Sequence, residues 1–185
     1  MIEIEHWHHD RPDWTDALLK FYKVTFEPLE RLAAQRHVMT DDEFRTVMAD
    51  RRVIKYLARG DGDEIVGLAT MSNDLESMPL ISPAFFKARY PVEYRLKAIY
   101  YVGFVGCADG ARAFEPLIHH MIRDAAPEPI IAVDVCTYNA HTRQMPRVIE
   151  DSARRIDPGV TARLLDRQSF WSYHFTNELA RGSDS

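Results

Sequence analysis

Cysteine is scarce in this sequence, and long apolar runs are absent. The two cysteines, Cys107 and Cys136, show no C-x-x-C spacing, which argues against a disulfide framework and a cysteine-rich zinc ribbon. So few cysteines are typical of a reducing cytoplasm, and we expect a cytoplasmic protein. No stretch approaches the roughly 18 to 20 consecutive apolar residues of a membrane span, and residues 1–5 lack a signal-peptide pattern. We therefore expect no membrane partner.

Clustered positive charge is also absent. The chain has 28 acidic against 23 basic residues, a net charge of −5, and no long Lys/Arg run. Neutralising phosphates requires clustered lysine and arginine, so nucleic acid is not an expected partner. A hydrophobic content of 46% and a charged content of 28% are those of an ordinary globular protein, and 185 residues fit one domain. We expect this domain to span residues 1–177, with a frayed tail at residues 178–185.

The first half of the chain carries clear strand and helix signals. A two-residue apolar period predicts a strand at residues 2–5, and three- and four-residue spacing predicts a helix over residues 14–34, which Pro28 ends or kinks. Thr40 followed by Glu43 is a capping box, which predicts the start of a short second helix.

The middle of the chain predicts a hairpin and then an aromatic-rich helical segment. β-branched runs at residues 52–59 and 64–72 flank Gly60-Asp61-Gly62-Asp63, a strong hairpin signal. Ser82-Pro83 predicts a helix start within residues 73–97, a segment rich in phenylalanine and tyrosine.

The second half alternates apolar runs with helical stripes. It predicts strands at 98–106, 129–136, 161–166 and 169–175. Between the first two strands, a helix starts near 111–113, so that Pro116 lies near its first turn. After the second strand, Pro146 opens a helix and Pro158 stops it.

This order of elements resembles the GNAT N-acyltransferase superfamily over nearly the whole chain. The order is strand, two helices, three strands, helix, strand, helix and two strands. The resemblance implies an α/β fold with a mixed, mostly antiparallel central sheet and helices on both faces. Residues 73–97 would then be a helical insertion between the third and fourth strands, acting either as a lid on the acceptor side or as a dimer contact or extra core.

The resemblance implies acetyl-CoA or another acyl-CoA as the donor. In the superfamily the fourth strand splays from its neighbour and pairs with the pantetheine arm, and the next loop and helix N-terminus hold the pyrophosphate. The residues of this chain that match these cofactor-binding positions are Tyr101, Val102, Gly103, Phe104, Val105, Gly110, Ala111, Arg112, Ala113 and Asn139.

The phosphate loop departs from the superfamily pattern. That loop usually reads Arg/Gln-x-x-Gly-x-Gly/Ala, whereas Cys107-Ala108-Asp109-Gly110-Ala111-Arg112 keeps only the central glycine. Asp109 also places a negative charge where the phosphates sit, and Arg112 is the candidate to compensate it. The departure leaves two interpretations, an altered CoA pose or a different natural ligand.

Three residues are candidates for catalytic proton transfer. Asp134 lies in a predicted apolar strand, where an unpaired carboxylate is costly, so it is either a base toward an amine or a structural hydrogen-bond acceptor. Tyr138 and His141 follow that strand, where open α/β sheets place ligands, and either is able to act as acid or base. The superfamily commonly has a tyrosine in the next helix that protonates the leaving thiolate. The predicted helix that follows Asn139 contains no tyrosine, so that role is unassigned.

Metal chemistry is not expected. His6, His8 and His9 lie close together in sequence, but matching ligands are not evident elsewhere, and a solvated strand end is the preferred interpretation.

Together these observations predict an enzyme that transfers an acyl group from a CoA thioester to a small-molecule amine by direct attack in a ternary complex. Two alternatives stay open. One is a GNAT-like domain that uses a carrier-protein thioester, and the other is a domain that binds a small ligand without catalysis. The resemblance also makes a homodimer one expected assembly.

Overall fold

A computed structural model describes residues 2–34, 38–79, 81–108, 110–125 and 127–174. The predicted tail at 178–185 lies outside these residues. Within them, no helix is both long enough and apolar enough to cross a bilayer.

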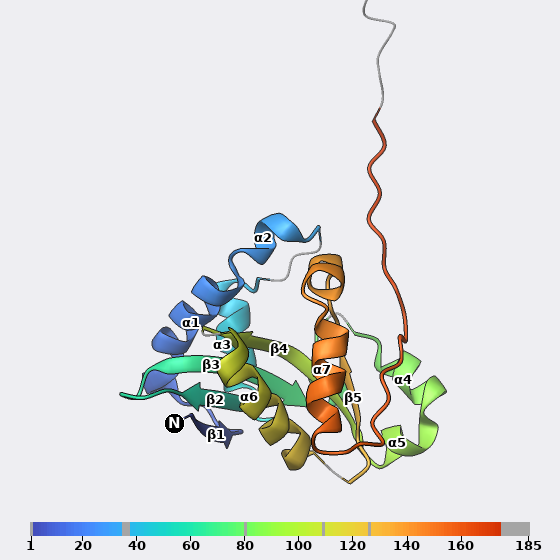
Figure 1. Ribbon diagram of the computed structural model, residues 1–185, viewed down its shortest axis with the longest axis horizontal. Helices are drawn as coiled ribbons and strands as arrows, with labels where there is room; N and C mark the ends of the chain where they lie inside the picture. The colour runs from blue at the N-terminus through green and yellow to red at the C-terminus, as the bar shows by residue number, and fades with distance from the viewer. Residues whose placement is uncertain (1, 35–37, 80, 109, 126, 175–185) are drawn as a thin grey trace, which may run out of the picture.

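A five-stranded sheet forms the centre of the molecule (Figure 1). Its spatial order follows the chain order, with β1 to β4 antiparallel to their neighbours and β5 parallel to β4. The strands are β1 (Glu3–Trp7), β2 (Ile54–Arg59), β3 (Ile65–Ser72), β4 (Ile99–Cys107) and β5 (Ile130–Val133). The predicted mixed, mostly antiparallel sheet is therefore confirmed.

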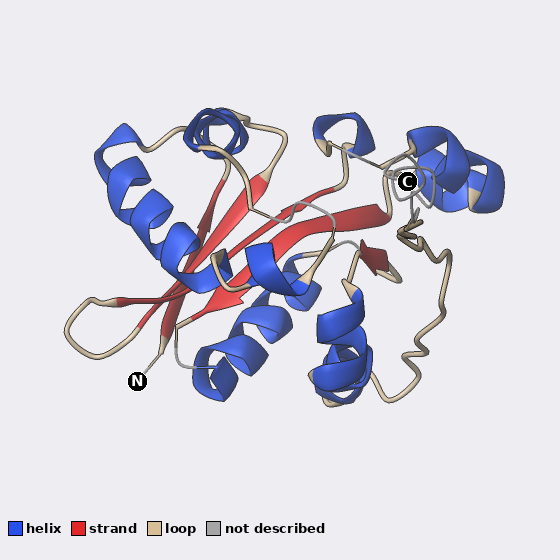
Figure 2. Cartoon of the chain, turned by 90° about the horizontal axis from the view of Figure 1, so that it is seen from above, coloured by secondary structure: helices blue, strands red, loops and turns tan. Residues whose placement is uncertain are grey.

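Helices cover both faces of this sheet (Figure 2). Strand alternation separates two apolar cores: Tyr56 and Ala58 contribute to the core under α6, whereas Leu57 between them packs with residues of α1 and α3. α7 packs beside α6. The helices of these layers are α1 (Pro12–Phe26), α2 (Leu29–Leu32), α3 (Asp41–Ala49), α6 (Gly110–Asp124) and α7 (Met145–Arg154).

Three local sequence signals act as predicted. The Thr40 hydroxyl accepts a hydrogen bond from the Glu43 N–H at 3.3 Å, and the Glu43 carboxylate accepts one from the Thr40 N–H at 2.8 Å, so the capping box begins α3. β2 and β3 pair from Ile54↔Met71 onward and form the predicted hairpin. Pro28 ends α1 and stands at the start of α2.

The helical insertion between β3 and β4 is also confirmed. It contains a 3-10 turn and two short helices: Leu75–Ser77, α4 (Pro83–Arg89) and α5 (Pro91–Arg95). The Ser82 hydroxyl caps α4 by accepting from the Phe85 N–H, and Pro91 begins α5. Phe86 is buried in one cluster with Tyr101 and Ala132, so the insertion forms core against β4 and β5.

Three boundary predictions need correction. β5 ends at Val133, not at residue 136, so Asp134 and Cys136 follow the strand instead of lying in it. α6 begins at Gly110, which places Pro116 inside the helix and beyond its first turn. Residues 161–174 form no strand. The first and third errors have one cause, because strand-like sequence becomes a strand only where a neighbour completes its hydrogen-bond ladder.

Candidate functional site

The centre of the candidate site is the place where β4 and β5 part. The two strands pair only from Ile99↔Ile130 to Val102↔Val133. β4 continues to Cys107, so its residues 103–107 have no strand partner on the β5 side within the described chain. An unpartnered strand edge offers backbone N–H and C=O groups to an extended ligand.

A β-bulge in β4 lies at the point of separation. Thr70 pairs with Phe104 and Met71 with Val102, which leaves Gly103 as the extra residue. A Cβ on Gly103 would lie 2.6 Å from Thr70 Oγ1, so the position accepts only glycine without movement. The bulge also reverses the strand's alternation, because Val102 packs under α6 whereas Phe104 packs under α1.

The absence of a side chain at Gly106 makes room for α1. A Cβ on Gly106 would meet Phe26 Cε2 at 2.7 Å and Thr25 Cγ2 at 2.9 Å. The missing side chain is therefore needed for the packing of α1 on β4.

Asp134 is held by a tyrosine from the neighbouring strand. The Tyr101 hydroxyl donates to Asp134 Oδ1 at 2.8 Å. Burial, together with the adjacent Asp134 carboxylate, raises the pKa of Tyr101 well above its usual range, so this hydroxyl keeps its proton and remains the donor. Asp134 itself is exposed just beyond the end of β5, which leaves its other oxygen accessible to a ligand.

Tyr138, Asn139 and His141 share one π-helical turn, Tyr138–Thr142, after β5. Such turns are frequent at functional sites. Asn139 Oδ1 is buried and has no hydrogen-bond partner among the described residues, whereas His141 is exposed. The turn therefore presents one unsatisfied acceptor and one accessible imidazole.

In the described part of the first turn of α6, one side chain is buried and one is exposed. The Ala113 methyl is fully buried in the core under α6, so only its backbone faces outward from the sheet. Arg112 is exposed. Asp109 and the side chain of Ala111 lie outside the described part, and the burial of Gly110 is likewise not described.

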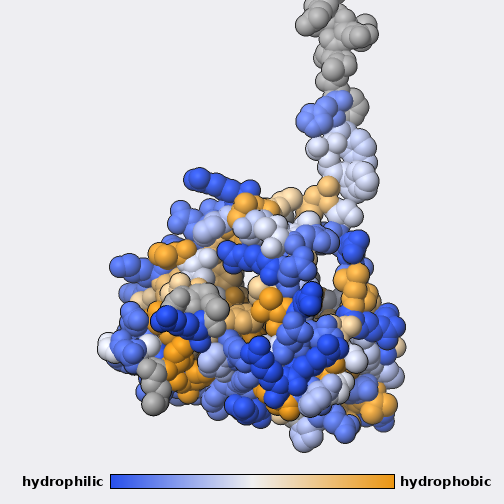
Figure 3. Space-filling model, viewed as in Figure 1, coloured by the Kyte–Doolittle hydropathy of each residue, from blue (hydrophilic) through white to orange (hydrophobic). Residues whose placement is uncertain are grey.

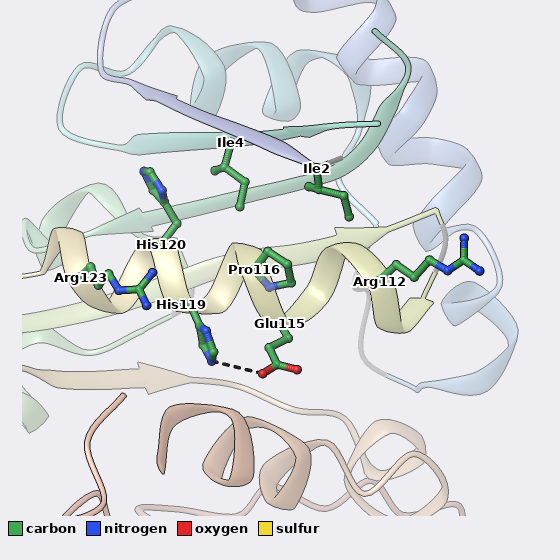
Figure 4. A pocket seen from close by; sticks show the side chains of 8 residues that line it. All are labelled: Ile2, Ile4, Arg112, Glu115, Pro116, His119, His120 and Arg123. Atoms are coloured by element: carbon green, nitrogen blue, oxygen red, sulfur yellow. Dashed lines mark ion pairs between the residues drawn. The ribbon is translucent and has the colours of Figure 1, made fainter. Parts of the chain in front are cut away.

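Arg112 also lines a cavity of about 560 Å³ on the other side of α6, toward β1 (Figure 4). Ile2, which precedes β1, Ile4 of β1 and His120 of α6 line it as well. Glu115 Oε1 lies 3.6 Å from His119 Nε2 at its lower rim. None of the three predicted catalytic residues lines this cavity.

Next to this cavity is a polar cluster that the sequence did not predict. His6 Nδ1 lies 3.0 Å from His120 Nε2, and the Tyr56 hydroxyl donates to Asp124 Oδ2 at 2.8 Å. Burial and the neighbouring His6 lower the pKa of His120. His6, His8 and His9 are exposed, as expected of a solvated strand end, and His6 in addition contacts α6 through His120. The described residues contain no set of three or more His, Cys, Asp or Glu able to hold a metal.

Comparison with known proteins identifies the fold. No protein-family profile and no curated protein matches the sequence. Solved structures do match. An aminoglycoside 6'-N-acetyltransferase from Acinetobacter baumannii superposes with a TM-score of 0.53 at 11% identity, covering 95% of this chain and 100% of its own. The chain has the GNAT fold.

Two further GNAT structures agree. A ribosomal-protein-alanine N-acetyltransferase from Brucella melitensis biovar Abortus 2308 matches with a TM-score of 0.52 and 13% identity, over 94% of this chain and 99% of its own. An aminoglycoside acetyltransferase from an uncultured soil metagenomic sample, in complex with sisomicin, matches with a TM-score of 0.51 and 10% identity, over 92% of this chain and 97% of its own. The sequence-based GNAT resemblance is therefore confirmed at the level of the fold.

Proposed function

We propose that this protein transfers an acyl group, most simply acetyl, from an acyl-CoA thioester to the amine of a small molecule. The observation that carries the proposal is the separation of β4 from β5 at the Gly103 bulge. This separation leaves a strand edge open next to Asp134, the accessible carboxylate at the end of β5.

The residues present fit an extended thioester donor. Backbone groups of residues 103–107 would pair with the amide-containing pantetheine arm. The N-terminus of α6, whose first-turn Ala113 carries only a buried methyl, would face the phosphates with its backbone N–H groups. The buried Asn139 Oδ1 lacks a partner within the described chain and would accept a hydrogen bond from a donor amide. These positions are the proposed CoA site.

Catalysis would depend on positioning two reactants beside a base. Asp134 accepts the proton of the amine as its nitrogen attacks the thioester carbonyl carbon. The C–N bond forms, backbone N–H groups at the bulge stabilise the oxyanion, and the C–S bond then breaks. The departing thiolate takes a proton from Tyr138 or His141 on the adjacent turn. Tyr101 is a positioning residue, because it fixes the carboxylate without touching substrate.

The first test is binding and turnover with acetyl-CoA. Calorimetry with acetyl-CoA and free CoA tests the donor site, and release of free thiol in the presence of an amine panel tests transfer. Absence of binding to both would remove CoA as the donor.

The second test separates the roles of Asp134 and Tyr101. Asp134→Asn should lower kcat by about 10²-fold or more, with little change in the KM for acyl-CoA, because general base catalysis contributes roughly that much. Asp13→Asn, an exposed carboxylate on α1, is the matched control and should retain activity. Tyr101→Phe should lower kcat by less than Asp134→Asn does, with little change in the KM for acyl-CoA, because the carboxylate keeps its place in the chain but loses the hydrogen bond that orients it. Unchanged kcat in Asp134→Asn would refute the assignment.

A carrier-protein thioester is the second candidate donor. It is favoured by the phosphate loop, which keeps only Gly110 of the superfamily pattern. A carrier-bound thioester presents the pantetheine arm without the nucleotide, so it needs the β4 edge but not the loop. Turnover with an acylated carrier protein but not with acyl-CoA would select this candidate, and no turnover with either would favour a non-catalytic ligand domain.

A further inference from the structure

The cavity between β1 and α6, called the β1–α6 cavity below, lies apart from the candidate site of acyl transfer. Ile2 and Ile4 point toward it from the start of β1, and Pro116 and His120 line it on α6 (Figure 4). The candidate catalytic residues follow β5, which is at the opposite edge of the sheet from β1. The volume of about 560 Å³ is that of a small-molecule site, for which about 300 to 1,000 Å³ is typical.

The middle of the β1–α6 cavity is aliphatic. Ile2 and Ile4 pack against the core under α6 but are only partly buried, and Pro116 lies opposite them. β1 is the first strand of the sheet and pairs with β2, so its side chains lie at the margin of the core that α6 covers. Hydrophobic surface accordingly lies among hydrophilic surface over β1 and α6 (Figure 3). Covering these aliphatic groups with a ligand chain would remove apolar surface from water.

Arg123 and His120 give one end of this cavity a positive character. Arg123 is exposed and makes no ion pair or hydrogen bond with the residues that the structure describes. Burial lowers the pKa of His120, and the charges of His6 and Arg123 act in the same direction, so Arg123 lies within electrostatic reach of the imidazole. His120 Nε2 is 3.0 Å from His6 Nδ1. When His6 donates this bond, His120 has its Nδ1–H available for a ligand.

The carboxylates near this end are engaged elsewhere. Glu115, the carboxylate among the described lining residues, pairs with Arg155 of α7, and this pairing lowers the pKa of Glu115. Asp124 accepts from the Tyr56 hydroxyl at 2.8 Å and does not line the cavity. The charge of Arg123 is thus not neutralised by either carboxylate, and the cavity favours an anion over a cation.

We propose that the β1–α6 cavity binds an aliphatic carboxylate of medium chain length, with its head group at Arg123 and His120 and its chain along the aliphatic middle. Arginine suits this head group because its N–H groups match the two oxygens of a carboxylate. Arg112, toward the proposed phosphate loop, is about 16 Å from Arg123 along α6, at about 1.5 Å per residue. The head group is therefore separate from the proposed CoA site, and its test needs no CoA.

Calorimetry with octanoate on the full chain is the first experiment. Octanoate should bind saturably, and hexanoate should bind about 4- to 16-fold more weakly, because each buried methylene contributes about two- to fourfold in affinity. Octylammonium has the same chain with the opposite charge and should bind at least about tenfold more weakly than octanoate. Absence of octanoate binding, or equal binding of octylammonium, would overturn the proposal.

Variants of the lining residues test the orientation of the ligand. Arg123→Gln should weaken octanoate binding by about tenfold, because it removes charge-assisted hydrogen bonds, and Ile4→Thr should weaken it by at least about threefold. Arg51→Gln, at an exposed arginine outside the lining, is the matched control and should bind like the wild type. Far-ultraviolet circular dichroism checks the fold of each variant. Unchanged affinity in folded Arg123→Gln would refute the position of the head group.

A photo-crosslinking experiment locates the ligand chain directly. The probe is a medium-chain carboxylate that carries a diazirine on its chain. After photolysis, peptide mass spectrometry should find the label on residues 2–4 or 115–123. Label concentrated on residues 103–107 or 133–141 would show that the carboxylate occupies the candidate site of acyl transfer instead, and would overturn the assignment to the β1–α6 cavity.

Discussion

Lys55 makes the stability of this protein depend on pH in the mildly alkaline range. Its side chain is fully buried in β2, and its ammonium donates to the backbone carbonyls of Asp50 and His8. Burial lowers the pKa of Lys55 from 10.5 to about 8, against the opposing effect of the Asp50 and Asp10 carboxylates. The folded state therefore holds this proton less tightly than the unfolded chain does.

The sign follows from proton linkage. Below a pH of about 8 both states are protonated, and the full cost of burying the charge is present. Between about 8 and 10.5 the unfolded chain binds more protons, so stability rises with pH. The whole shift of 10.5 to about 8 corresponds to about 3 kcal/mol. By pH 9.5, about 1.5 pH units above the folded pKa, about 2 kcal/mol of this should be recovered.

The perturbation is Lys55→Met, which replaces the apolar stem of the lysine by an apolar side chain of similar length and removes the titrating amine. Urea unfolding of both proteins at about pH 7.5 and about pH 9.5 gives the assay. The free energy of unfolding of the wild type, minus that of the variant, should rise by about 2 kcal/mol between the two pH values. Burial raises the pKa of Cys107 to about 11, so its contribution to the free energy of unfolding falls as pH rises in the alkaline range. Both proteins contain Cys107, so this contribution cancels in the difference between them. A difference that stays constant or falls with pH would refute the reasoning.

Three further predictions concern packing and capping. Phe44 is fully buried against the rings of Tyr22 and Phe104, so Phe44→Ala should lower the free energy of unfolding by about 3 to 5 kcal/mol in urea; a loss below about 1 kcal/mol would contradict this packing. Gly103→Ala should lower the free energy of unfolding, because the new methyl group would clash with the Thr70 hydroxyl, and adding Thr70→Ala should remove that clash. A double-mutant cycle should therefore give a coupling energy of roughly 0.5 to 3 kcal/mol between the two positions. Additive effects of the two substitutions would argue against the contact. Thr40→Ala should cost about 1 kcal/mol by removing the cap of α3, whereas Thr40→Ser should not; equal losses in both would rule out the capping hydroxyl as the cause.

Signals that depend on a few neighbouring residues were readable from the sequence. The capping box at Thr40, the helix start at Ser82-Pro83 and the hairpin around Gly60-Asp61-Gly62-Asp63 all appear where their spacing predicts. In each case the groups that form the hydrogen bonds lie within a turn of one another, so local order is enough to specify them.

The candidate site was only partly readable for the opposite reason. Asp134 was a candidate because a carboxylate is costly in an apolar run, but its partner Tyr101 is 33 residues away. The His6–His120 contact joins residues 114 positions apart and left no signal in the sequence. The bulge at Gly103 arises from the register of β4 against β3, which no single strand encodes.

The sequence by itself determined the order of elements from β1 to α7 and, through it, the GNAT fold, because apolar periodicity and turn chemistry act over short distances. The tertiary structure decided where strands end and which polar groups meet. β5 stops at Val133 because β4 diverges from it, and that divergence opens the edge beside Asp134. Residues 161–174 have the composition of strands but no neighbour in their own sheet, since a strand requires the hydrogen-bond ladder of a second segment as well as its own sequence.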